Sequence, residues 1–269
     1  TNERLTTEGE CGMQSRWLRL LGIGVLLSGV FGATSAYADD HVKGYVLMRV
    51  DTDVENEVEN EIDGVCKDHK SSVAVQTAKQ GLVTLITPNG KSDDDFVIEL
   101  RGDKRVRYAE LDKLHSLPLV SGKPFHFPFD RGNNSGKYNS QNAKAQVNLS
   151  SSLSKTGGAG VQVAVLDTGI TFSHPVLKGV ALAGANFVSQ SLTPKDIADT
   201  PASLAVGHGT MVSGVVALIA PKAKILPVRV LNADGTGSTM SIIQGIEYAI
   251  QQGAQVINMS FGTNLSSDI

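Results

Sequence analysis

The sequence predicts an α/β protein in which a parallel sheet with flanking helices follows a small α+β module. Between residues 161 and 260, short apolar runs alternate with helical patterns, which is typical of βαβ units. Glycine is plentiful, with 28 residues, and aromatic residues make up only 5%, a composition that suits many tight turns. A stretch rich in Gly, Asn, Ser, Pro and Lys, from 121 to 160, separates this part from the module before it.

Composition and charge narrow the class of protein. The 269 residues are 41% apolar, so the chain can bury a substantial core in one or two domains. The 24 basic and 27 acidic side chains give no basic excess, so nucleic acid is not an expected partner. The two cysteines, Cys11 and Cys66, are too few for a disulfide framework and show no zinc-ligand spacing.

A secretory signal is predicted near the start of the chain. Two basic residues, Arg16 and Arg19, precede an apolar run over 20–33, and the small-residue site Ala36-Tyr37-Ala38 follows. We therefore expect residues 13–38 to be a signal peptide that is cleaved at its end.

This leader sets expectations for the rest of the chain. Residues 1–12 would lie upstream of the natural start and are not expected to belong to the natural protein. Four glycines and the Ala-x-Ala exit favour cleavage over anchoring, so we expect a secreted protein, extracellular or periplasmic, with no stable membrane anchor. Cys66 would then be a lone thiol that fills space in a core.

The module over residues 42–117 begins with two predicted strands, 44–50 and 82–87. The acidic stretch between them, 53–63, is interpreted as a solvated face or loop and not as a metal cluster. A last strand is predicted over 106–117.

One helix is predicted in this module, over 91–105. Ser92 or Asp93 is its expected N-cap, and the apolar positions include Phe96, Ile98 and Leu100.

The second part alternates between strands and helices. Strands are predicted at 161–167, 223–231 and 255–260, and helices at 209–220 and 238–253. In the last helix the residues at helical spacing are Ile242, Ile246, Ala249 and Ile250, and Gly253 stands where a C-terminal cap belongs.

Asp167 and His208 are the candidate catalytic residues. Asp167 ends a predicted parallel strand, and the ligand sites of such sheets lie at the carboxyl ends of their strands. His208 stands between two glycines, ahead of a helix expected to pack close to the sheet through Gly214 and Ala217. A carboxylate beside the imidazole would fix its tautomer, as a general base acting on a serine hydroxyl requires. Taken singly, Asp167 also suits a turn cap and His208 an ordinary exposed side chain.

Four segments, in this order, resemble segments of the subtilisin-like serine peptidases, the peptidase S8 or subtilase family. They are VAVLDTGI, GHGTMVSGVVA, LPVRVLNADGTGS and YAIQQGAQVINMSFG. The segment LVTLITPNGKSDDDFVIELRGDKRVRYAELDKLHSLP resembles the end of that family's inhibitory propeptide. The resemblance implies an inhibitory propeptide at 42–117 and the N-terminal part of a subtilisin-like catalytic domain at 121–269.

By this resemblance the chain is part of a secreted precursor of a serine endopeptidase that hydrolyses polypeptides through an Asp-His-Ser triad. His208 would act as general base and then as general acid, and Asp167 would orient it. The family's nucleophile segment, of the form G-T-S-M-A, does not occur in the sequence, nor does the later Asn that helps to bind the oxyanion. The serine is therefore expected beyond the end of this chain, and the propeptide is expected to serve as intramolecular inhibitor and folding aid.

Substrate is expected to bind by strand addition between two segments of the catalytic part. The expected substrate-binding residues are Gly235, Thr236, Gly237, Ser260, Phe261 and Gly262. A plain turn is the alternative for the first three. The chemistry requires no cofactor, and no metal residue is predicted. Calcium commonly accompanies the family, but no ligand set in this sequence is specific for it.

Other functions stay as alternatives. A catalytically inactive, secreted binding module with the same fold is the main one. Phosphoryl transfer through Asp167 is disfavoured, because the second aspartate that such enzymes need would stand where Gly169 is. A dinucleotide site is disfavoured because the glycines at 157–160 precede their strand instead of following it.

Met211 stands where many family members carry a second His, a change expected to affect packing.

Overall fold

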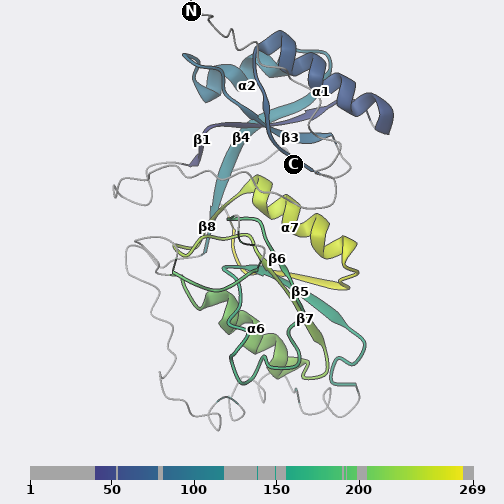
Figure 1. Ribbon diagram of the computed structural model, residues 1–269, viewed down its shortest axis with the longest axis vertical. Coiled ribbons are helices and arrows are strands. Elements are labelled where there is room, and N and C mark those ends of the chain that lie inside the picture. The colour runs from purple at the N-terminus through teal and green to yellow at the C-terminus, as the bar shows by residue number, and fades with distance from the viewer. Residues whose placement is uncertain are drawn as a thin grey trace, which may run out of the picture. The chain divides into compact units, whose positions relative to one another are not determined.

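The computed structural model describes residues 40–52, 54–77, 81–117, 138, 149, 156–189, 191, 193–198 and 205–262. The chain divides into two compact units (Figure 1). The described residues of unit 1 run from His41 to Asp112, and those of unit 2 are Asp40 and the residues from Lys113 onward.

The predicted upstream segment, residues 1–12, and the predicted signal peptide, residues 13–38, lie outside the described residues, as does nearly all of 118–155. Among the helices that the structure describes, none combines the length and the apolar character needed to cross a bilayer.

Unit 1 contains a sheet in the order β2-β3-β1-β4 and two helices. The strands are β1 (His41–Val50), β2 (Val73–Gln76), β3 (Leu82–Ile86) and β4 (Val106–Ser116), and the helices are α1 (Glu55–His69) and α2 (Asp93–Arg101). Strand β3 pairs antiparallel with β1, where Thr84 is opposite Leu47, and antiparallel with β2. The end of β4, from Lys113, belongs to unit 2.

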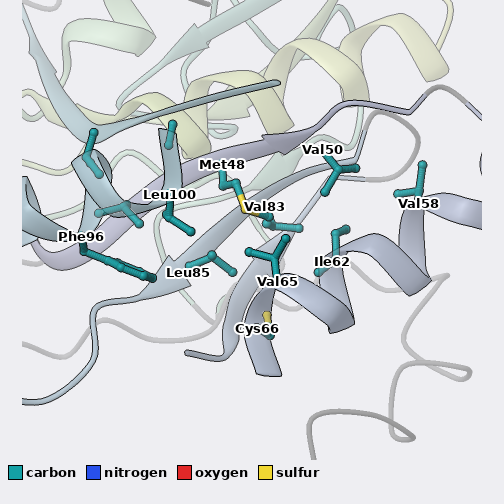
Figure 2. Close-up of a cluster of buried hydrophobic side chains, with 13 residues drawn as sticks. Met48, Val50, Val58, Ile62, Val65, Cys66, Val83, Leu85, Phe96 and Leu100 are labelled. Carbon is teal, nitrogen blue, oxygen red and sulfur yellow. The ribbon is translucent and has the colours of Figure 1, made fainter. Parts of the chain in front are cut away.

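Apolar side chains from both helices and from the sheet form the core of unit 1 (Figure 2). The labelled members are Met48, Val50, Val58, Ile62, Val65, Cys66, Val83, Leu85, Phe96 and Leu100. Cys66 is a buried free thiol in this core.

The predicted helix of the module is α2, and Ser92 is its N-cap, where the side-chain oxygen accepts a hydrogen bond from the Asp95 amide. Phe96 and Leu100 are buried, as expected. Ile98 was assigned to the wrong face. It is 68% exposed, and Val97 faces the core in its place, because 96, 97 and 100 share one side of a helix whereas 98 does not.

Of the two forms expected for the acidic stretch over 53–63, the structure shows a solvated helix face and not a loop. It lies mostly in α1, whose acidic residues leave one apolar stripe at Val58, Ile62 and Val65. That spacing of four and three residues is typical of an amphipathic helix. Strand β2 was not predicted either.

Unit 2 contains a parallel sheet in the order β6-β7-β5-β9. The strands are β5 (Gln162–Asp167), β6 (Ala185–Asn186), β7 (Lys224–Arg229) and β9 (Val256–Met259), and the helices are α6 (His208–Ile219) and α7 (Thr239–Gln251). The central strand β5 pairs along its whole length with β7, from Gln162 opposite Lys224 to Asp167 opposite Arg229.

The two helices of unit 2 cover opposite faces of this sheet (Figure 1). On one face Ala164 and Leu166 of β5 pack with Ile242 of α7, and on the other Val163 and Val165 pack with Ala217 of α6. This is the predicted architecture, a parallel sheet with flanking helices. It places the carboxyl end of β5 at the sheet edge where ligands bind in such folds.

Helix α7 begins and ends as predicted. The Ser238 side chain accepts a hydrogen bond from the Ser241 amide, and Gly253 follows the helix with a φ of 75°. Ile242 and Ala249 are buried, but Ile250 is 64% exposed and is not part of the apolar face.

A charged cluster at the surface of unit 1 is centred on His69. Its Nδ1 is 2.8 Å from Glu99 Oε1 and its Nε2 is 2.9 Å from Asp103 Oδ2, so both ring nitrogens donate to carboxylates. Burial alone would lower the pKa of His69, but these hydrogen bonds and the two negative charges outweigh burial and raise the pKa above 6.5. The imidazolium form therefore stabilises unit 1.

We predict that unit 1 loses stability as the pH rises. Because the folded-state pKa of His69 is raised, its contribution is complete below about pH 6.5 and disappears as the pH passes the raised value. Urea unfolding between about pH 5 and pH 9, with unit 1 followed by hydrogen exchange, measures this. His69→Asn should flatten the dependence, whereas His174→Asn, at an exposed histidine of unit 2, should not. Equal slopes for the parent and His69→Asn would contradict the prediction.

Candidate active site

Asp167 is the last residue of β5 and is completely buried. Its main-chain carbonyl accepts hydrogen bonds from the amides of Val230 (3.0 Å) and Leu231 (3.2 Å), which extends the pairing with β7 past the strand end. Its side-chain Oδ1 accepts the Thr168 amide at 2.7 Å. A buried carboxylate is costly unless it is hydrogen-bonded, and this one is held at a fixed place at the edge of the sheet.

His208 is the first residue of α6 and is also buried, with 8% of its surface exposed. Its Nδ1 lies 2.8 Å from Asp167 Oδ1 and 2.9 Å from Oδ2. An ionised carboxylate can only accept, so Nδ1 carries the proton and donates it to Asp167. In the neutral imidazole Nε2 is then the nitrogen that can accept a proton. The structure thus brings the two residues together, 41 positions apart in the sequence.

A glycine allows this approach of helix to strand. A Cβ at Gly209 would lie 2.2 Å from the main-chain oxygen of Gly169 and 3.1 Å from Asp167 Cβ. The expectation for Gly214 is wrong, because the nearest atom to a Cβ there is Tyr138 Cε2 at 3.9 Å. The close approach thus occurs at Gly209, in the first turn of the helix.

Four of the six predicted substrate-binding residues flank one strand end in unit 2. Residues Leu114, His115 and Ser116 pair antiparallel with β8 (Thr236–Ser238). The amide of Leu117 donates to the Gly235 carbonyl at 3.1 Å. On its other side, Ser116 donates to the Gly262 carbonyl (3.0 Å) and accepts from the Gly262 amide (3.1 Å).

Each of the six residues has a defined place. Gly235 has a φ of 88°, and a Cβ at Gly237 would lie 2.2 Å from the Val230 carbonyl oxygen, so both positions suit glycine. Thr236 and Gly262 both pair with Ser116. Phe261 packs against the core on the α7 face of the sheet. Ser260 accepts a hydrogen bond from the Asn258 side chain at 2.9 Å.

Two polar residues at this site were not predicted, Thr168 and Asp196. Thr168 is 1% exposed and Asp196 is 8% exposed, and their side chains are hydrogen-bonded to each other and to the start of α6. Thr168 directly follows Asp167, so the sequence alone could have placed it at the site. Asp196 lies in a segment with no periodic pattern.

No cation site accompanies the pair within the part of the chain that the structure describes. No three side chains of the types His, Cys, Asp or Glu gather there in a group that could hold a metal ion.

The fold and the site together define an α/β protein whose parallel sheet carries a carboxylate–imidazole pair at its carboxyl edge. Residues 158–269 match the model of the subtilase family, Peptidase S8. This part of the chain therefore belongs to the subtilase family.

Curated relatives agree with this assignment. Minor extracellular protease Vpr of Bacillus subtilis is 40% identical over 119 residues, which are 41% of this chain and 15% of Vpr. Thermitase of Thermoactinomyces vulgaris is 38% identical over 115 residues, 39% of this chain and 38% of thermitase. Subtilisin-like protease 5 of Arthroderma otae is 32% identical over 192 residues, 67% of this chain and 44% of that protein. The chain thus spans less than half of each of these relatives.

A solved structure shows the same fold. Fervidolysin from Fervidobacterium pennivorans, described as a keratinolytic enzyme related to subtilisin, matches with a TM-score of 0.62 and 22% identity. The match covers 87% of this chain and 38% of fervidolysin.

We predict that Gly209→Ala separates α6 from β5. The new Cβ would overlap main-chain atoms of Gly169, which is itself packed against the main chain of Pro194 and Lys195, so a loss of about 2 to 3 kcal/mol in unfolding free energy is expected. Gly214→Ala, in the same helix, is the control and should be neutral or stabilising by up to about 1 kcal/mol. Urea denaturation of both variants measures the difference. Equal stability of the two would show that the close approach is not required.

Proposed function

We propose that this chain is the N-terminal part of a serine endopeptidase precursor. The observation that carries the proposal is the hydrogen bond from His208 Nδ1 to the buried Asp167 carboxylate. It leaves Nε2 as the nitrogen that accepts a proton, which is the arrangement needed to activate a serine hydroxyl. His208 would take the proton from the serine and return it to the leaving amine, and Asp167 would hold the tautomer and stabilise the imidazolium.

The nucleophile in this proposal is a serine outside these 269 residues. Two serines of the proposed substrate-binding segments, Ser238 and Ser260, have other partners. Ser238 caps α7 through the Ser241 amide, and Ser260 accepts from Asn258. A G-T-S-M-A segment is absent from the sequence. The relatives are named as proteases, which supports polypeptides as the substrate class.

The experiment adds a nucleophile-bearing segment to this chain and measures peptide hydrolysis. Asp167→Asn should leave the fold intact but lower kcat by about 10⁴-fold, the magnitude seen when the orienting carboxylate of a serine peptidase is removed. Glu247→Gln on α7 makes the same chemical change away from the pair and should have no effect. The 269-residue chain alone should hydrolyse no peptide.

The alternative, a catalytically inactive binding module, makes the opposite forecast. It would require the extended protein to bind polypeptides with the same affinity whether Asp167 and His208 are present or replaced, and to release no product. Turnover that survives in both Asp167→Asn and His208→Ala would instead mean that other residues do the chemistry.

We also propose that residues 42–117 are an inhibitory propeptide whose end occupies the substrate strands. The pairing of Ser116 with both Thr236 and Gly262 supports this, because an extended peptide that gains main-chain hydrogen bonds on both edges is bound as a substrate would be. Secretion is part of the same proposal and rests on the leader over 13–38. N-terminal sequencing of exported protein tests it, since a chain beginning at residue 1 would contradict cleavage.

We predict that residues 42–117, added in trans, inhibit the extended enzyme, and that Ser116→Pro weakens the inhibition about tenfold or more. Proline has no amide hydrogen, so the bond from Ser116 to the Gly262 carbonyl is lost. Ser116→Ala keeps that amide and should inhibit like the parent. Inhibition constants from peptide hydrolysis compare the three. Equal inhibition by the Pro and Ala variants would place the propeptide end elsewhere.

A further inference from the structure

Helix α6 begins without a side-chain cap of its own. Its N-cap is Gly207, with a φ of 96°. The amides from Gly207 to Thr210 have no acceptor within the helix, because the first four amides of an α-helix never do. The His208 amide donates to a main-chain carbonyl. The other three donate to the side chains of Asp196 and Thr168, which lie outside the helix.

Asp196 accepts three hydrogen bonds from the two ends of this first turn. Its Oδ1 accepts the Gly207 amide at 2.8 Å, and its Oδ2 accepts both the amide (3.1 Å) and the hydroxyl (2.6 Å) of Thr210. Its carboxylate thus spans the residues on either side of His208. A carboxylate at the positive end of a helix dipole is stabilising, so this position suits an acidic side chain.

Thr168 connects this carboxylate to the catalytic pair. The Thr168 hydroxyl donates to Asp196 Oδ1 at 3.1 Å, so its oxygen lone pairs are left to accept the Gly209 amide at 3.0 Å. The main-chain amide of Thr168 donates to Asp167 Oδ1 at 2.7 Å. One hydrogen-bonded chain therefore joins the Asp167 carboxylate to both sides of His208.

The segment that carries Asp196 is itself fixed to the sheet. Ile170 donates to the Pro194 carbonyl at 2.8 Å, and the Asp196 amide donates to the Ile170 carbonyl at 3.2 Å. The Lys195 carbonyl accepts a hydrogen bond from Nη1 of Arg229, a β7 residue that is 1% exposed. The main chain around Asp196 is thus held by Ile170, three residues after β5, and by Arg229, the last residue of β7.

We propose that Asp196 is a positioning residue of the active site. Through Thr168 and the first turn of α6, it fixes where His208 lies relative to Asp167. Its catalytic consequence rests on the proposed function, but its effect on the His208 ring does not.

The test follows the His208 Nδ1 proton by NMR in the ¹⁵N-labelled 269-residue chain. In the parent this proton should give a slowly exchanging signal, because it is buried in a hydrogen bond to Asp167. Asp196→Asn replaces one acceptor oxygen by an NH₂ group, which can only donate. That group faces the amide donors of the first turn of α6, so at least one hydrogen bond is lost. It should make the proton exchange about tenfold faster or more, the size expected for losing a hydrogen bond to a charged group.

Thr168→Val and Thr168→Ser form the second, matched pair. Valine removes the hydroxyl at nearly constant shape and should make the His208 Nδ1 proton exchange faster. Serine keeps the hydroxyl and should give the slow exchange of the parent. Ile242→Ala, in the core on the α7 face, is a control that lowers the melting temperature without changing the signal. In an extended, active protein, Asp196→Asn should lower kcat by about 10²-fold at nearly constant KM.

The outcomes separate this proposal from the proposed function. A parent signal that neither Asp196→Asn nor Thr168→Val changes would overturn the positioning role and leave the pair standing. Loss of the signal in Ile242→Ala as well would show a merely structural effect and would overturn it too. Absence of the signal in the parent would count against both. If Asp196→Asn does not fold, the Val and Ser variants of Thr168 decide.

Discussion

The structure of this site depends on how closely the first turn of α6 approaches the end of β5. The main chain at Gly209 lies against the main chain at Gly169, at a distance that leaves no room for a Cβ. That contact brings an imidazole on a helix within hydrogen-bond distance of a carboxylate on a strand. The parallel pairing of β5 with β7 supplies the other half of the constraint, because it fixes the Asp167 main chain on a buried strand.

The pattern of the sequence was sufficient for the part of the fold that carries the site. Strands β5, β7 and β9 are short apolar runs, α6 and α7 begin near glycine or serine signals, and the alternation of these elements predicts a parallel sheet. Asp167 therefore lies at the edge of the sheet where the parallel strands have their carboxyl ends. His208 was selected because its glycine-flanked position precedes a helix of small residues, although the glycine responsible for the close packing proved to be Gly209 rather than Gly214.

The misses have physical causes. Helix α1 was missed because its acidic residues outnumber the apolar ones, although Val58, Ile62 and Val65 are spaced as a helix requires. Ile98 was placed in a core because it is apolar, whereas its helical phase puts it in solvent. Ile250 was chosen for its helical spacing with Ile242 and Ile246, but it is 64% exposed and lies outside the buried face. Asp196 could not be found by spacing at all. Its role arises from tertiary contacts of its carboxylate with Thr168, Gly207 and Thr210, which no local pattern encodes.

Main-chain hydrogen bonds in unit 2 join the residues that follow Lys113 to two later segments of the chain. The segment from Leu114 to Leu117 lies between Thr236 and Gly262, and these hydrogen bonds are all main-chain to main-chain. Main-chain pairing gives affinity without selecting side chains, which suits both an inhibitory segment and a range of polypeptide substrates. Selectivity would then come from side-chain pockets beside these strands.

If Asp167 and His208 activate a serine, the rate at which that serine is covalently labelled depends on both residues. A serine-directed phosphonofluoridate should react with the extended protein at its nucleophile serine, and mass spectrometry should locate the adduct. We expect His208→Ala and Asp167→Asn each to slow this labelling by orders of magnitude while the variants stay folded. Labelling at the parent rate in both folded variants would contradict it.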